Sequence, residues 1–74
     1  MEEKKIVYEI IISIWNIVKE YFFQKKSDEE IGIMLDKVEA EEKRFLQYGE
    51  TYNLLFRGIW SAFRQFYERE NSNG

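Results

Sequence analysis

Cysteine, histidine and proline are absent from the 74 residues, and glycine occurs only four times. Without cysteine no disulfide can form, and without cysteine or histidine the usual structural zinc sites cannot be built. Without proline, and with few glycines, turn signals are scarce, which favours long helices. A chain of this length buries only about 60% of its unfolded surface, so we expect its stability to depend on close packing or association.

Positive charge is also in short supply. The formal net charge is −3, which argues against non-specific electrostatic binding of nucleic acid, because phosphate neutralisation needs clustered lysine and arginine. Glu9, Lys19 and Glu20 interrupt the longest apolar run, so we expect neither a membrane span nor a signal peptide. With 45% hydrophobic residues the chain is too apolar to be disordered. We expect a folded cytoplasmic protein.

The longest apolar run covers residues 6–23, IVYEIIISIWNIVKEYFF, in which thirteen of eighteen residues are apolar or aromatic. On a helix, Glu9, Ser13, Asn16 and Glu20 fall in one narrow strip, and apolar side chains cover roughly 260° of the circumference. A helix of this kind requires neighbours on nearly every side.

A strand is an alternative for the first half of this run, because apolar residues also recur at every second position from Ile6 to Ile14. We prefer a helix because the polar strip keeps the helical period and no turn residues follow that would pair a strand. Glutamates near the start and Lys25 and Lys26 near the end suit the helix dipole. We predict a helix over residues 3–25.

The segment Ser27-Asp28-Glu29-Glu30 matches a capping box and predicts a second helix over residues 28–47, with Gly49 just beyond its end. The apolar positions of this helix form a stripe expected to face the core: Ile31, Met34, Leu35, Val38, Phe45 and Leu46.

A third helix is predicted over residues 51–69, with Thr51 as its N-cap and a frayed tail over residues 70–74. Its apolar and aromatic residues, Phe66 among them, occupy an arc of about 160° that we expect to face inward. Short links between the three helices predict a single domain, an antiparallel three-helix bundle.

The apolar circumference of the first helix exceeds what two neighbours in a bundle can cover. One flank carries aromatic and aliphatic residues around a lysine, a mixture typical of interfaces: Tyr8, Ile12, Trp15, Lys19 and Phe23. We predict that this flank is an interface, most simply in a helical homodimer. The alternative is that the second and third helices splay and enclose the first.

Glu42 projects into the apolar stripe of the second helix, where an unpaired carboxylate would be costly. It is interpreted as an edge residue or one half of a salt bridge, with Lys19, Arg57 and Arg64 as possible partners. The alternative is a polar contact that fixes the register of a dimer.

No chemical site is recognisable. Without histidine and cysteine, a nucleophile or general base would have to come from other residues, and none lies in a known motif, so we expect no catalytic residue. Glu39, Glu41 and Glu42 lack the spacing of a calcium loop, so we expect neither metal nor cofactor.

Four short motifs make the chain resemble small uncharacterised helical proteins encoded in phages and prophages of low-GC Gram-positive bacteria. These are Trp15-Asn16, Lys19 with Tyr21, Tyr48-Gly49-Glu50, and Phe66-Tyr67-Glu68-Arg69. The resemblance implies an accessory protein of a mobile element that binds a host or phage protein.

The leading hypothesis is therefore a non-enzymatic protein–protein interaction module that forms a homodimer. The alternative is a small dimeric nucleic-acid-binding regulator that contacts phosphates through Arg57, Arg64 and Arg69, which share the polar face of the third helix.

Overall fold

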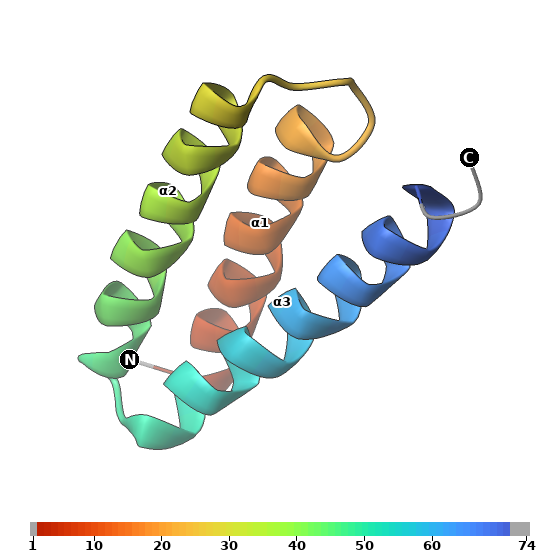
Figure 1. Cartoon of the computed structure of the whole chain (residues 1–74). Helices are drawn as coiled ribbons and strands as arrows, with labels where there is room; N and C mark the ends of the chain where they lie inside the picture. Colours follow the sequence, from red (N-terminus) through yellow and green to blue (C-terminus); the bar gives the residue numbers. More distant parts are fainter. Residues whose placement is uncertain (1, 72–74) are drawn as a thin grey trace.

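A computed structural model describes residues 2–71, and these form three α-helices and no strand. Helix α1 spans Glu3–Tyr21, α2 spans Asp28–Leu46 and α3 spans Glu50–Asn71. Each helix packs against both others, which confirms the predicted fold of three packed helices. In Figure 1, α1 and α2 run antiparallel and α3 crosses them obliquely. The strand alternative for the first half of the apolar run is wrong, because α1 covers it.

Helix α1 ends at Tyr21, four residues before the predicted end. The amide of Phe22 still donates a hydrogen bond to the Val18 carbonyl, at 2.8 Å, and then the chain leaves the helix. The reason lies in the next helix. Because Ser27 caps α2, a first helix extended to residue 25 would leave one residue to reverse the chain, and helix connections need two or more.

The capping box at the start of α2 is confirmed. The Glu30 amide donates to the Ser27 hydroxyl at 3.2 Å, and the Ser27 amide donates to a Glu30 carboxylate oxygen at 3.3 Å. Acidic residues fill the first turn of α2 and basic residues its last turn, so both ends complement the helix dipole. Helix α2 therefore has locally specified ends.

Gly49 serves both helices that meet at it. Its φ of 130° lies in the region that favours glycine, so it ends the turn after α2 as predicted. Its carbonyl also accepts hydrogen bonds from the amides of Tyr52 and Asn53, at 3.1 and 3.4 Å. Helix α3 therefore starts at Glu50, and the prediction of Thr51 as the N-cap is wrong. Residues 70 and 71 are helical rather than frayed, and residues 72–74 lie outside the described part of the chain.

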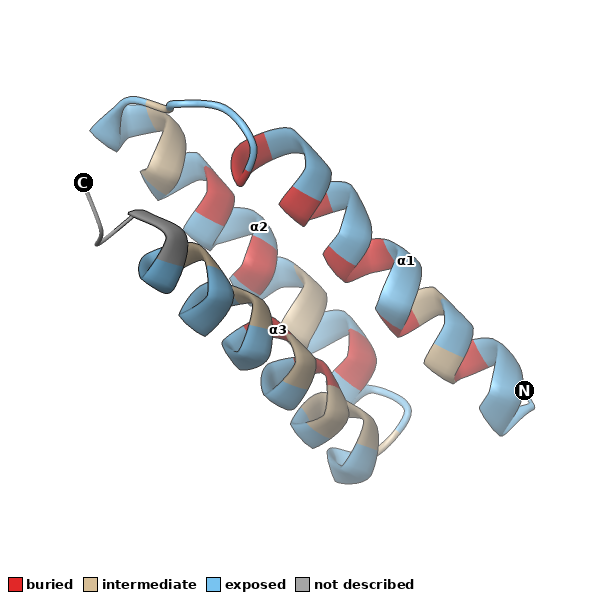
Figure 2. Ribbon diagram, turned by 90° about the vertical axis from the view of Figure 1, so that its right-hand side faces the viewer, coloured by how far each residue is buried: buried red, intermediate tan, exposed pale blue. Residues whose placement is uncertain are grey.

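The core lies along the line where the three helices meet, as the buried positions in Figure 2 show. Phe45 of α2 and Phe56 of α3 are fully buried and stack with ring centroids 5.7 Å apart. Phe22, just after α1, packs on Trp60 and Tyr67 of α3, with centroids 5.4 and 4.8 Å apart. The fully buried residues of α1 are Ile10, Ile14 and Val18.

Four residues predicted for the core are exposed instead: Leu35 and Leu46 on α2, and Ala62 and Phe66 on α3. The two leucines lie at the edge of the stripe, and α2 buries a narrower strip centred on Val38 and Phe45. Phe66 lies in the C-terminal half of α3 and has 51% of its surface accessible. The oblique crossing of α3 leaves apolar edges uncovered.

Candidate functional site

The four apolar residues predicted as an interface are exposed. Tyr8 and Phe23 each have 63% of their surface accessible, Trp15 has 44% and Ile12 has 37%, and Lys19 between them is also exposed. Helices α2 and α3 therefore do not enclose this side of α1, which was the alternative interpretation. Buried residues such as Ile10 and Ile17 lie on the opposite flank, against the core.

Sequence reasoning missed Ile11, which is also half-exposed. It lies three residues after Tyr8 and four before Trp15, so the three side chains are neighbours on the helix surface. This spacing was the signal that could have found it. We call the exposed set Tyr8, Ile11, Ile12, Trp15, Lys19 and Phe23 the α1 face.

The α1 face is continuous and extends towards α3. The rings of Trp15 and Phe23 meet edge to face with centroids 6.4 Å apart, and Phe23 and Phe66 line one surface hollow beside the chain reversal. With about 200 Å² for a large aromatic side chain, the exposed apolar parts sum to on the order of 500 Å². The largest apolar patch of a monomeric protein covers roughly 300–600 Å² and is often functional.

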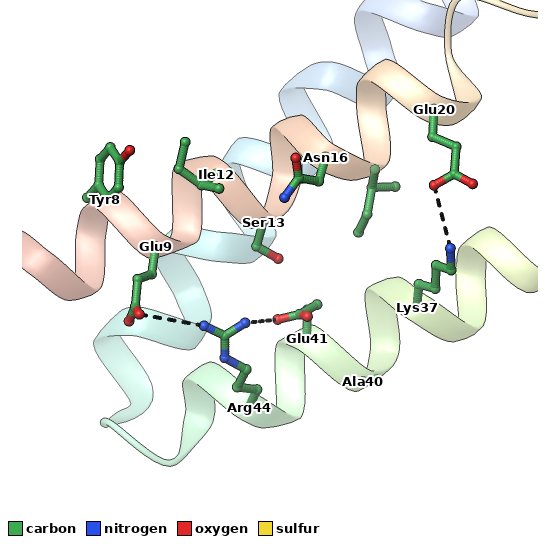
Figure 3. Close-up of a pocket in the computed structure, with 11 residues that line it drawn as sticks. Tyr8, Glu9, Ile12, Ser13, Asn16, Glu20, Lys37, Ala40, Glu41 and Arg44 are labelled. Carbon is green, nitrogen blue, oxygen red and sulfur yellow. Dashed lines mark hydrogen bonds and ion pairs between the residues drawn. The ribbon is translucent and has the colours of Figure 1, made fainter.

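A polar groove of about 520 Å³ runs beside the α1 face, between α1 and α2. Figure 3 shows Arg44 of α2 lying between two carboxylates. Its guanidinium is 2.8 Å from a Glu41 oxygen and 4.0 Å from a Glu9 oxygen, and further along Lys37 lies 3.5 Å from Glu20. Tyr21 and, to a lesser extent, Glu20 hold the pKa of Lys37 above its usual value. The groove is thus bordered by ion pairs that join the two helices.

Two oxygen atoms in this groove are buried and lack hydrogen-bond partners: the Ser13 hydroxyl and the Oε2 atom of Glu9. Ser13 is only 9% exposed, and in Figure 3 its side chain points from α1 into the space towards α2. Buried polar atoms are almost always paired, so two unsatisfied oxygens lining one groove mark a place that suits an added donor. Ser13 and Glu9 appeared in the sequence only as parts of a polar strip.

Glu42 is half-buried at the edge between α2 and α3, and its backbone carbonyl accepts a hydrogen bond from the Asn53 amide group at 3.0 Å. The structure places it in one surface hollow with Arg57 and Arg64, and this hollow is lined by residues of α2 and α3 and not by Lys19. Among the described side chains, none forms an ion pair within 4.0 Å of the Glu42 carboxylate. Glu42 therefore fits the edge-residue interpretation rather than the salt bridge within the described part of the chain, and the register contact in a dimer stays a prediction.

The three arginines of the nucleic-acid hypothesis are exposed along α3. Arg64 lies 3.3 Å from the Glu68 carboxylate, so its charge is partly neutralised within the same helix. Arg57 and Arg64 line a hollow with three glutamates, Glu39, Glu42 and Glu68. The basic patch that phosphate binding requires is absent from this hollow, although nucleic-acid binding itself stays untested.

Within residues 2–71, no three acidic side chains converge in a way that could hold a metal ion. None of the three helices, over the same residues, combines the length and apolar character needed to cross a membrane. The search for relatives gave nothing: no family model, curated protein or solved structure matches this chain. The α1 face and the groove beside it therefore carry the functional argument.

Proposed function

We propose that this protein is a non-enzymatic protein-binding module that associates through the α1 face. The observation that carries the proposal is the continuity of exposed apolar and aromatic side chains along α1, centred on Trp15. Tryptophan and tyrosine in such patches are the residues that contribute most to binding energy in protein interfaces. A role in a phage or other mobile element, with a host or phage protein as partner, stays a prediction from the resemblance.

The size of the chain supports association. A domain of this length has a small core, and the described residues hold neither disulfide nor metal cluster to reinforce it. The exposed face of α1 is also the side of the helix with the most uncovered aromatic surface. Covering it would add apolar burial that the single chain lacks.

Sedimentation equilibrium over a hundredfold range of concentration tests the proposal. We expect reversible association of the wild-type chain, and dissociation at least tenfold easier in Trp15→Ala, because one central anchor is worth more than about 1.4 kcal/mol. The control is Leu54→Ala, which removes an apolar side chain that is also about half-exposed, but on α3. Equal effects of both variants, or a wild-type monomer at every concentration, would contradict the proposal.

A further inference from the structure

The spacing of residues on the α1 face indicates which partner covers it. Tyr8, Ile12, Trp15 and Lys19 follow one another at steps of four, three and four residues. This is the 3.5-residue repeat with which one helix packs along another. The face is therefore shaped for a straight helix of similar length, and α1 itself is such a helix.

We propose that the partner is a second copy of this chain, packed antiparallel through the α1 face, with Lys19 of each copy inserted into the α1–α2 groove of the other. This inference rests on the proposed function and adds the identity of the partner, its orientation and a polar contact that fixes the register.

The face is symmetric about a point between Trp15 and Asn16. Positions 8 and 23 lie equally far from that point, and so do positions 12 and 19. Within α1, an antiparallel pair with its two-fold axis there sets Ile12 against Lys19 and Trp15 against Asn16 of the second copy. Tyr8 then lies near the chain reversal of the second copy, which carries Phe23. A parallel pair in register would instead set Lys19 against Lys19, where like charges repel.

Lys19 and the groove complement each other. Lys19 takes part in no ion pair among the described side chains, and its ammonium carries three hydrogen-bond donors. In the antiparallel pair it lies opposite Ile12 of the second copy, which is three residues from Glu9 and lines the same groove as Glu9 and Ser13. These residues hold the two buried acceptor oxygens without partners. The groove is lined by three carboxylates and two basic side chains, a formal charge of −1, so it favours a cation.

The area is adequate for a reversible dimer. The exposed apolar part of the face is on the order of 500 Å² per copy. This is more than half of the roughly 800 Å² that a standard interface buries per partner, and the polar rim, including Lys19, Asn16 and the mouth of the groove, adds to it.

Spin labels on introduced cysteines test the orientation, which is simple in a chain without native cysteine. With a rise of about 1.5 Å per residue, the antiparallel pair places labels at Lys4→Cys about 35 Å apart, and labels at Asn16→Cys within about 20 Å. A parallel dimer gives short distances at both positions and would overturn the inference while leaving the proposed function intact. A chain that sediments as a monomer, with no dipolar coupling between labels, overturns both.

A charge reversal tests the contact of Lys19 with the groove. Lys19→Glu sets a carboxylate against Glu9 of the second copy, so we expect dimer dissociation to become easier by about tenfold or more. The loss should be several-fold smaller on a Glu9→Gln background, because the repelling charge is then gone. Lys43→Glu, the same charge change on the exposed side of α2, is the control. If the effects of Lys19→Glu and Glu9→Gln are additive, the groove does not receive Lys19; circular dichroism checks that each variant is folded.

Discussion

Trp15 and Phe23 meet edge to face on the outside of the protein, with ring centroids 6.4 Å apart, although they belong to α1 and to the chain reversal that follows it. A large exposed apolar patch is an informative departure from the burial of apolar residues, and other aromatics of this chain, such as Trp60, are buried. The two tryptophans therefore report on different surfaces, one on the core and one on the α1 face.

This difference predicts a concentration-dependent fluorescence signal. Acrylamide should quench Trp15 readily in dilute solution and less readily as association covers it, while Trp60 stays protected throughout. Stern–Volmer slopes of the wild-type chain should fall with rising protein concentration. Trp15→Phe, which leaves Trp60 as the single emitter, should give a low slope that does not change; a falling slope in this variant would show that the signal has another origin.

The stacked pair of Phe45 and Phe56 at the centre of the core predicts a large loss of stability. Phe56→Ala should lower the free energy of unfolding by about 3–5 kcal/mol, because it removes a buried ring and leaves a cavity. Phe66→Ala removes the same side chain from an exposed position and should cost less than about 1 kcal/mol in the monomer. Urea unfolding by circular dichroism measures both, and similar losses would contradict the placement of Phe66.

The two helix starts predict unequal effects of the same kind of substitution. Ser27→Ala removes the hydroxyl that caps α2 and should cost about 1 kcal/mol. Thr51→Ala should change the free energy of unfolding by less than about 0.5 kcal/mol, because the turn at Gly49 provides the start of α3. The unfolding midpoints in urea give the comparison. A larger loss for Thr51→Ala would restore Thr51 as the cap.

Two glycines should respond in opposite directions to alanine. Gly49→Ala forces a side chain into a backbone with φ of 130° and should destabilise the protein by about 1–3 kcal/mol. Gly58 lies within α3, and a Cβ added there meets no other atom within 4 Å, so Gly58→Ala should stabilise the protein by about 0.5–1 kcal/mol. The melting temperatures of both variants and the wild type measure these effects. A lower melting temperature for Gly58→Ala would contradict the prediction.

The capping box also predicts a dependence on pH. Hydrogen bonds from the backbone and side chain of Ser27, with a smaller contribution from Lys26, hold the pKa of Glu30 below its ordinary value. Since the folded-state pKa is the lower one, the stabilisation is complete above the unfolded-state pKa and disappears as pH falls through the folded-state value. Between pH 6 and about pH 3, the melting temperature of the wild type should therefore fall further than that of the Glu30→Gln variant. If the melting temperatures of the two proteins fall in parallel as the pH is lowered, Glu30 is not the cause of the loss of stability in acid.

The sequence by itself determined the three helices, the capping box at Ser27 and the turn at Gly49. These features depend on interactions within a few residues, which a linear pattern records directly. It also indicated that α1 has more apolar surface than two neighbours can cover. For Glu42, helical spacing indicated a place within the apolar stripe of α2, whereas the structure leaves it half-buried at the edge.

The tertiary structure alone decided which apolar residues are covered. The oblique crossing of α3 exposes Phe66, and the narrow contact of α2 exposes Leu35 and Leu46, although all three fit the helical periodicity of a core. Crossing angles depend on how side chains of different helices interdigitate, and periodicity within one helix does not contain that information. For the same reason the two unpaired oxygens of Glu9 and Ser13 became visible only once α2 was placed against α1.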